Sequence, residues 1–352
     1  MRPLAVVEAV PASDAERSAL AAFRAELIAE EIGIPNSMSA NGGETGVLLR
    51  FLRARKLNVS KALAMFRETL EWRAAEDADA LMRAPLVLDE FRESAKLYPA
   101  SYHGRDVHGR PVYIERTGTA KFAEVIRRIG ADGFLRMHLR AMEYQARVLL
   151  PAASADAGEA VTQMCNVIDV SNLSLYDTVS RSEVLAAVRK IADVDQKHYP
   201  ENLGVTLVCN APWSFQAAWA VVRPFLDAKT AAKFVVVGAG ASGVAELEKT
   251  LGKGRVPAFL GGTCRCEGGC VCMDPEVGET PEVLTKAQVE YAECFLEEED
   301  EKDEKEEEEE EKKVEEDEEV EEEKDEKVEE EEEEEEKKKV EEDEEERGTP
   351  CV

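Results

Sequence analysis

The sequence predicts an α/β fold, in which a small helical unit precedes a mostly parallel sheet that is covered by helices on both faces. Two observations predict the sheet. The segments 163–170, 205–212 and 233–238 are short, nearly continuous apolar runs, and helical segments separate them along the chain. A third observation sets the C-terminal part of the chain apart. Residues 297–347 contain 37 acidic and 10 basic side chains and four valines, with a net charge of −27.

The rest of the chain has 38 acidic and 34 basic residues, so the expected folded part is nearly neutral and offers no basic surface for nucleic acid. No apolar run approaches the ~18–20 residues that cross a bilayer. The N-terminal apolar stretch is interrupted by Glu8, which argues against a signal peptide. We therefore expect a cytosolic, reducing environment in which the eight cysteines are free thiols.

The helical unit is predicted from capping residues and apolar spacing. One helix is expected over residues 14–32, with Ser13 or Asp14 as its cap. Residues 36–44 are expected to form a loop, and a helical pair follows over residues 46–75. The apolar stripe of the second helix of this pair consists of Val59, Leu63, Phe66 and Leu70.

From residue 99 onward, strands are expected to alternate with helices. A turn over residues 103–110 leads into a strand at residues 111–116. A helix follows at residues 133–151, and Pro151 is expected to end it. The next elements are a strand, a helix, a strand, a helix and a strand at residues 163–170, 182–200, 205–212, 214–226 and 233–238.

Enzymatic signatures are weak in this sequence. The pattern Gly238-x-Gly240-x-x-Gly243 has the spacing of a dinucleotide-binding turn, but no second strand with an acidic residue follows ~20 residues later. We interpret the pattern as a tight strand-to-helix turn and keep a dinucleotide-dependent enzyme as a remote alternative. We predict no catalytic residue, because the histidines at positions 103, 108, 138 and 198 are not next to a serine or cysteine nucleophile.

A cysteine cluster raises the question of a metal. Cys264, Cys266, Cys270 and Cys272 fall within nine residues, and four thiolates can hold zinc. Structural zinc sites more often use two C-x-x-C pairs with a longer spacer between them. We therefore predict no metal and expect a glycine-rich loop with thiols that pack or stay free. Zinc remains the alternative.

Two basic segments could form a phosphate site. Arg53, Arg55 and Lys56 follow one another closely, and Lys233 lies near Thr230. Such cations are usually solvated at helix ends. If the fold brought them together, guanidinium and ammonium groups with a hydroxyl would suit a phosphate.

The segment 214–226 is an apolar helix that ends near Pro224. Packing in the core is one interpretation. The other is a moving lid with an aromatic face that meets lipid, because a proline kink suits a hinge.

Six segments taken in order resemble one family: LLRFLRARKLNV, DVHGRPVYIER, KHYPENLG, CNAP, RPFLDAKTAAK and VPAFLGG. They are similar to the CRAL-TRIO lipid-binding domains of the Sec-fourteen type, the phosphatidylinositol/phosphatidylcholine transfer proteins. The resemblance runs from about Thr45 to Cys270. The loop LGGTCRCEGGCV is most similar to plant and algal members.

The resemblance implies a small N-terminal helical domain and a sheet that floors a large apolar pocket for one lipid. It implies no enzymatic activity and no cofactor other than the bound phospholipid. We accordingly divide the chain into an N-terminal extension, a helical domain, a lipid-binding domain, a linker or helix, and an acidic tail at residues 1–40, 41–94, 95–272, 273–296 and 297–352.

The resemblance also implies roles for individual residues. The positions that match the family's phosphatidylinositol headgroup site are Arg55, Lys56, Glu201, Thr230 and Lys233. The pocket would include Tyr113, Tyr144, Met164 and Asn166. The gate helix would carry Phe215, Trp219, Val222, Phe225 and Leu226.

The choline side of the pocket departs from the family pattern. Met164 and Asn166 stand where the family has a Ser-x-Thr pair, and methionine cannot donate a hydrogen bond. This substitution argues against phosphatidylcholine and for a different second ligand.

We therefore predict a soluble, monomeric lipid-binding protein that takes up phosphatidylinositol and exchanges or presents it between membranes. It would be cytoplasmic and peripheral on Golgi- or endosome-type membranes. Its partners would be phospholipid and, transiently, the membrane surface; a phosphoinositide kinase is a candidate partner. The alternatives are a carrier of a sterol, tocopherol or terpenoid, and a lipid-sensing scaffold. We expect a disordered or partly helical tail from its charged composition. The spacings of its valines fit no heptad, which argues against a coiled coil.

Overall fold

The fold is taken from a computed structural model, which describes residues 6–82, 97–174, 181–266 and 269–271. All of them belong to one compact unit that spans residues 1–289. The predicted linker and acidic tail lie outside the described residues. No helix in the described ranges combines the length and apolar character that a membrane crossing requires.

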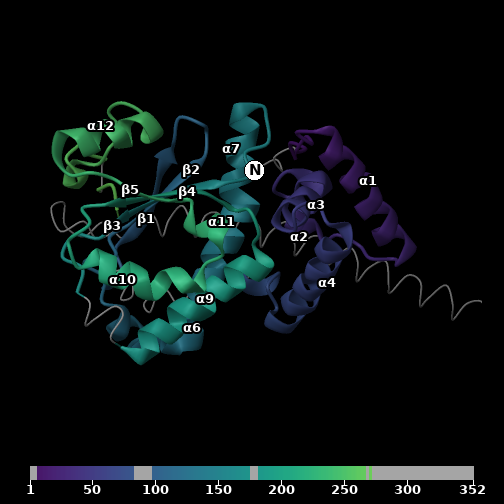
Figure 1. The fold of residues 1–352 in the computed structure, drawn as a ribbon, viewed down its shortest axis with the longest axis horizontal. Helices are drawn as coiled ribbons and strands as arrows, with labels where there is room; N and C mark the ends of the chain where they lie inside the picture. Colours follow the sequence, from purple (N-terminus) through teal and green to yellow (C-terminus); the bar gives the residue numbers. More distant parts are fainter. Residues whose placement is uncertain (1–5, 83–96, 175–180, 267–268, 272–352) are drawn as a thin grey trace, which may run out of the picture. The chain divides into compact units, whose positions relative to one another are not determined.

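The N-terminal part of the chain forms helices (Figure 1), and side-chain caps start two of them. Ser13 accepts a hydrogen bond from the Glu16 N–H at 3.2 Å and starts the first helix. Asn58 accepts a hydrogen bond from the Lys61 N–H at 2.9 Å and starts the fourth helix. The helices are α1 (Asp14–Ala29), α2 (Asn36–Ser39), α3 (Gly43–Ala54) and α4 (Val59–Glu76).

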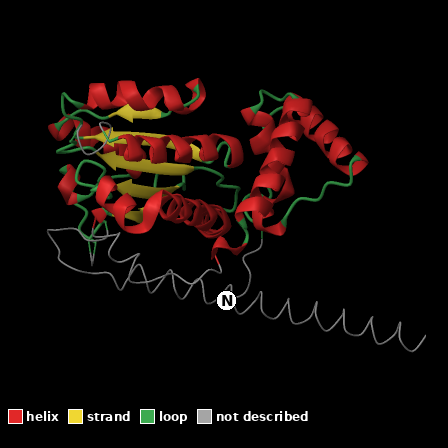
Figure 2. Cartoon of the chain, turned by 90° about the horizontal axis from the view of Figure 1, so that it is seen from below, coloured by secondary structure: helices red, strands yellow, loops and turns green. Residues whose placement is uncertain are grey.

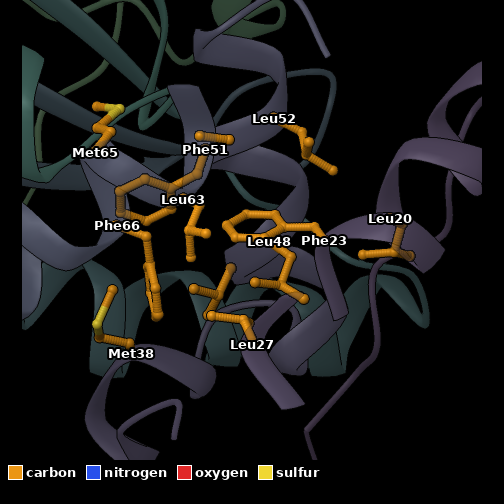
Figure 3. Close-up of a cluster of buried hydrophobic side chains, with 12 residues drawn as sticks. Leu20, Phe23, Leu27, Met38, Leu48, Phe51, Leu52, Leu63, Met65 and Phe66 are labelled. Atoms are coloured by element: carbon orange, nitrogen blue, oxygen red, sulfur yellow. The ribbon is translucent and has the colours of Figure 1, made fainter. Parts of the chain in front are cut away.

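These helices bury a core of their own (Figure 3). Phe66 packs edge-to-face against Phe51 and Phe23, with ring centroids 5.1 and 6.2 Å apart. All three rings are fully buried. This core fixes α1, α3 and α4 against one another, and it therefore holds the turn between α3 and α4, which carries the predicted cations.

The prediction of a loop over residues 36–44 was wrong in part, because the first four of these residues form the short helix α2. Pro35 precedes α2, and its fixed φ suits the entry to a helix. The turn to α3 uses Gly42 and Gly43, with φ of 81° and 66°. A single helical turn between proline and glycine has too few residues to show a periodic pattern.

Within the described residues the sheet has five strands, in the order β1-β2-β3-β4-β5. Strands β1 and β2 pair antiparallel, and the other neighbours pair parallel. The predicted, mostly parallel sheet is therefore confirmed. The strands are β1 (Ala100–Arg105), β2 (Pro111–Glu115), β3 (Met164–Asp169), β4 (Leu203–Cys209) and β5 (Phe234–Val236).

Strand β1 differs from the expectation of a turn over residues 103–110. The turn is shorter, because β1 continues to Arg105 before the chain reverses. Its pairing with β2 shifts register between Tyr102 and Arg105, and Gly104 has a φ of 59°. A bulged, polar edge strand lacks the apolar run by which the other strands were predicted.

Helices cover both faces of the sheet (Figures 1 and 2). Helix α12 packs on one face, whereas α6, α9 and α10 lie on the other. The helices of this part are α6 (Phe122–Tyr144), α7 (Leu150–Ala157), α9 (Ser182–His198), α10 (Phe215–Val222), α11 (Ala228–Ala231) and α12 (Gly240–Leu251). Short 3-10 segments occur at η1 (Ala80–Met82), η3 (Arg223–Phe225) and η4 (Ala258–Leu260).

Pro151 does not end a helix, contrary to expectation. The helix begins at Phe122, bends at Gly130 and passes through a π-helical segment, η2 (Gln145–Leu149), into α7. Pro151 then occupies the first turn of α7, where its missing N–H is tolerated. The wider π turn makes room for the proline ring.

Candidate functional site

A row of five side chains crosses the sheet on the face opposite α12. Strand register places Tyr102 against Tyr113 and Tyr113 beside Asn166. Asn166 is beside Thr206, which in turn is beside Phe234. Residues paired between neighbouring strands point to the same face of a sheet. The row therefore forms one continuous surface, with α10 against its β5 end and α6 against its β1 end.

The two faces of the sheet are packed differently at β2 and β3. On the α12 face, Val112, Cys165 and Val167 are almost completely buried. On the opposite face, Tyr113 and Asn166 are only half-buried. Interiors are normally close-packed. The partial exposure of central strand positions therefore indicates a face that is not fully covered by the protein itself.

Two polar atoms within this row have no hydrogen-bond partner among the described residues. They are Asn166 Oδ1 and Thr206 Oγ1, which lie on neighbouring strands. The Thr206 side chain is only 1% exposed. An unpaired buried polar group costs about 1–3 kcal/mol. Both oxygens are therefore suited to a hydrogen bond from a ligand or from water.

An aromatic cluster adjoins the row. The Tyr102 ring lies 5.3 Å from that of Tyr113 and 5.5 Å from that of Tyr144, measured between centroids. Burial raises the pKa of Tyr102. Met164 is 2% exposed and packs against Tyr113. Tyr113, Tyr144 and Met164 were predicted here from the resemblance, whereas Tyr102 was missed because β1 was taken to be partly a turn.

A charged cluster lies where β4 and β5 begin. Glu201 forms ion pairs with Lys229 and with Lys233, the second at 3.8 Å. The Lys233 ammonium also donates to the Leu203 carbonyl at 2.5 Å. Burial lowers the pKa of Lys233, and the Glu201 carboxylate offsets this only in part. Of the predicted headgroup residues, the structure thus joins Glu201 and Lys233, and it adds Lys229.

Thr230 belongs to the same segment. Asp227 caps the short helix α11 and accepts hydrogen bonds from the Lys229 and Thr230 N–H groups. The Thr230 hydroxyl also donates to Asp227 Oδ2, at 2.6 Å. The hydroxyl oxygen keeps its lone pairs and can still accept a hydrogen bond.

No hydrogen bond or ion pair in the described ranges joins the other two predicted headgroup residues to this cluster. Arg55 donates to the Ala54 carbonyl at 3.3 Å. Lys56 is exposed. Lys56 and Glu201 both have positive φ, 52° and 63°. Left-handed backbone at non-glycine residues is uncommon and clusters at functional sites.

Arg53 forms an ion pair outside the charged cluster, and this pairing could not be predicted from the sequence. Its guanidinium makes a two-pronged ion pair with Glu16 of α1, at 2.8 and 2.9 Å. This hydrogen bond raises the pKa of Arg53 although burial opposes it, and the Glu201 charge contributes. Arg53 therefore positions the turn after α3 and contributes positive potential near Glu201.

Helix α10 covers the row of side chains at its β5 end. The Trp219 ring lies 4.9 Å from Phe234, and Phe215 stacks on Trp219 at 6.2 Å. The helix ends at Val222, earlier than predicted. Pro224 lacks an N–H, and the chain passes into the 3-10 turn η3. Val222, Phe225 and Leu226 are half-buried.

The turn after α10 is tied to α9 by one side chain. Gln196 Nε2 donates to the Phe225 carbonyl at 2.7 Å, and Gln196 Oε1 accepts from the Asp227 N–H at 2.7 Å. One amide thus holds the backbone on both sides of Leu226. At the other end of α10, Trp213 is 89% exposed.

The glycine pattern after β5 has a packing role. A Cβ on Gly243 would lie 1.8 Å from the Gly238 carbonyl oxygen, so helix and turn require glycine to approach this closely. No strand follows α12 within the described residues. This topology argues against a dinucleotide-binding unit, which continues into a second strand.

Comparison with known families gives two matches in chain order. Residues 22–68 match the CRAL/TRIO, N-terminal domain, and residues 95–262 match the CRAL/TRIO domain. Among solved structures, the crystal structure of Sfh5 is similar, with a TM-score of 0.51 and 17% identity over 64% of this chain and 81% of that one. At this identity the likeness concerns the fold alone.

Similar proteins include members from plants and fungi. "Phosphatidylinositol/phosphatidylcholine transfer protein SFH12" of Arabidopsis thaliana is 32% identical over 77% of this chain and 48% of its own length. "Sec14 cytosolic factor" of Schizosaccharomyces pombe is 32% identical over 66% of this chain and 79% of its own. "SEC14 cytosolic factor" of Eremothecium gossypii is 34% identical over 68% of this chain and 77% of its own length.

The chain spans about half the length of the plant relatives, and it spans most of the length of the fungal ones. Both matched parts carry elements described above, with α3 and most of α4 in the first and the whole sheet in the second. Identity above 30% over most of a relative, together with these matches and the sheet order, shows that this chain belongs to the CRAL/TRIO family.

Proposed function

We propose that this chain binds one phospholipid between α10 and the sheet and transfers or presents it between membranes, with phosphatidylinositol as its main ligand. The observation that carries the proposal is the pair of unpaired oxygens, Asn166 Oδ1 and Thr206 Oγ1, on a sheet face where Asn166 is only half-buried. A polar group on a largely apolar ligand would satisfy them. The similarity to phosphatidylinositol/phosphatidylcholine transfer proteins supports a phospholipid.

The headgroup would bind at the charged cluster. Lys233 and Lys229 supply positive charge for a phosphate, and Glu201 and Thr230 can accept hydrogen bonds from inositol hydroxyls. Glu201 pairs with both lysines in the structure, and this pairing keeps the cations in place. Arg55 and Lys56 would join the site through the bound phosphate.

The proposed work is physical, and no enzymatic step is needed. Each CH₂ of an acyl chain that leaves water for an apolar site gains ~0.8 kcal/mol, and it loses a similar amount on leaving the bilayer. The exchange is then nearly balanced, and opening of α10 limits its rate. The exposed Trp213, together with Val221 on α10, would face the membrane during opening.

The direct test is transfer of labelled phosphatidylinositol between donor and acceptor vesicles. We expect transfer that is proportional to protein concentration and competes with unlabelled phosphatidylinositol. Transfer of a sterol or tocopherol without phospholipid transfer would favour the carrier of a non-phospholipid. Presentation to a phosphoinositide kinase, a monomeric state and action at Golgi- or endosome-type membranes belong to the same proposal.

Gln196→Met is expected to accelerate lipid exchange, because methionine has a similar size but makes neither hydrogen bond to the turn after α10. Loss of ~1–2 kcal/mol of closing free energy would raise the open population about 5- to 30-fold. Gln196→Glu keeps the acceptor for the Asp227 N–H, and its exchange rate should therefore lie between those of the native protein and Gln196→Met. The single-turnover release rate of a fluorescent lipid measures the effect; an equal rate in all three proteins would exclude Gln196 as a hinge residue.

Phosphatidylcholine transfer is expected to be weak, and to improve in Met164→Ser combined with Asn166→Thr. Two hydroxyls would then lie beside the Tyr102–Tyr113–Tyr144 cluster, whose ring faces suit a choline cation. Met164 is buried, and the double variant should therefore lose ~2–5 kcal/mol of stability. The assay compares transfer at a temperature where both proteins are folded. Efficient phosphatidylcholine transfer by the native protein would contradict this prediction.

Deletion of residues 297–352 is expected to strengthen binding to anionic vesicles at low salt. The segment 297–347 has a net charge of −27, and a negative leaflet at roughly −30 mV repels it. Screening should reduce the difference as salt increases, because the Debye length falls from ~30 Å at 0.01 M to ~10 Å at 0.1 M. Co-sedimentation of full-length and truncated protein over a salt series measures it. Equal binding at every salt concentration would leave the tail with another role.

A further inference from the structure

Three cysteines and one histidine meet at the edge of the sheet. Cys264, Cys266 and Cys270 come from the segment after η4, and His103 comes from β1. Their ligand atoms all lie within 4.8 Å of one another. From this arrangement we propose that the four residues bind one zinc ion, in a structural Cys₃His site that is separate from the proposed lipid site.

The distances among His103, Cys264 and Cys266 fit three ligands of a tetrahedral zinc site, and Cys270 Sγ lies within 4.8 Å of the other ligand atoms, close enough to be the fourth. His103 Nε2 lies 3.4 Å from both Cys264 Sγ and Cys266 Sγ, and the two sulfurs are 3.6 Å apart. Zinc bonds of ~2.3 Å to sulfur and ~2.0–2.1 Å to nitrogen, at tetrahedral angles, place ligand atoms roughly 3.5–3.8 Å from each other. A disulfide would need ~2.05 Å between the sulfurs.

Local backbone features aim the histidine at the cysteines. The register of β1 shifts between Tyr102 and Arg105, and Gly104 has a φ of 59°. A bulge of this kind redirects a side chain at a strand edge. Side chains alternate along a strand, so His103 points away from the face on which Tyr102 contacts Tyr113.

Hydrogen bonds hold the cysteine segment in place. The Cys264 N–H donates to the Val256 carbonyl at 2.9 Å, and the Ala258 N–H donates to the Cys264 carbonyl at 3.0 Å. The Gly269 N–H donates to the Cys266 carbonyl at 3.0 Å. Cys270 Sγ then lies 3.6 Å from the Cys264 carbonyl oxygen.

The proposed site differs from the expectation of free thiols and no metal. The sequence spacing offered four cysteines, and the structure brings three of them to a histidine that is 161 residues away from Cys264. Cys272 lies outside the described residues. Zinc here would fasten the segment after η4 onto β1, which is an edge strand, and would cover part of that edge.

The test uses the full chain, purified after expression with zinc and analysed for metal by mass spectrometry. We expect one zinc per chain in the native protein, in His108→Gln and in Cys272→Ser, and loss of zinc in His103→Gln and Cys264→Ser. His108 is a matched control, because it lies just after β1 but is exposed. Circular dichroism reports whether each variant folds.

A second measurement needs no variant. Chelation of the native protein should release the zinc, lower the melting temperature and make three further thiols reactive, since metal-bound thiolates are protected. Cobalt added to the stripped protein should give the absorption of a tetrahedral thiolate site. Absence of zinc and of cobalt absorption from the folded native protein would overturn the proposal. Zinc that persists in His103→Gln but is lost in Cys272→Ser would overturn the assignment of His103.

Discussion

Lys233→Ala is expected to lower phosphatidylinositol transfer between vesicles by about 10- to 150-fold, which corresponds to ~1.5–3 kcal/mol for a lost hydrogen bond to a charged group. The ammonium group lies beside Glu201 and is half-buried at the start of β5. In the proposed complex the ammonium group contacts the lipid phosphate at a position where water screens their attraction only partly. Transfer assays with equal amounts of folded protein measure the loss.

The matched control is Lys249→Ala, which removes a lysine from the exposed surface of α12. It should leave transfer unchanged. Adding Lys56→Ala to Lys233→Ala should abolish transfer, if the phosphate draws the exposed Lys56 into the site. The melting temperature should fall only slightly, because the burial cost of the Lys233 ammonium offsets much of what its ion pair with Glu201 and its hydrogen bond to the Leu203 carbonyl contribute. Unchanged transfer by the double variant would contradict the headgroup assignment.

Arg73→Ala is expected to lower the free energy of unfolding by ~3–5 kcal/mol, because it leaves a buried carboxylate without its cation. Arg73 of α4 donates two hydrogen bonds to Glu143 of α6, at 2.8 and 3.1 Å. Glu143 is 1% exposed and also accepts from the Tyr199 hydroxyl at 2.7 Å. Burial opposes the charge of Arg73, but Glu143 raises its pKa above the usual value.

Urea unfolding measures the difference, and Arg67→Ala provides the control. Arg67 is on the same helix, but its ion pair with Glu30 is largely exposed and should be worth less than ~1 kcal/mol. Glu143→Gln in the Arg73→Ala background should recover part of the stability, because the buried charge is then removed. A loss below ~1 kcal/mol in Arg73→Ala would mean that Glu143 finds other partners.

The central part of the fold could be predicted from the sequence because its strands are buried. Parallel strands such as β3 and β4 have both faces covered and appear as continuous apolar runs. Strand β1 has no such run, since it is a bulged edge strand with polar residues. The single turn of α2 is too short to show a period, and the π segment before Pro151 removes the conflict that proline normally creates.

The candidate site was predictable only where a residue belongs to a recognisable segment. Glu201 and Lys233 were predicted from the resemblance, and the structure joins them. Thr206 and Gln196 were missed. Thr206 is of interest because its hydroxyl is unpaired in the fold, and Gln196 because the fold brings it to the backbone of the turn after α10. The proximity of His103 to the cysteines also could not be predicted, because the spacing of the cysteines says nothing about a distant histidine.

The measurement that tests the central claim most directly is native mass spectrometry of the purified full-length chain, followed by identification of the released ligand. A single bound phospholipid that includes phosphatidylinositol is the predicted result, and Lys233→Ala should reduce the fraction that carries phosphatidylinositol. A protein that emerges without lipid and acquires none from phosphatidylinositol vesicles would contradict the account. A bound sterol or terpenoid in place of phospholipid would contradict it as well.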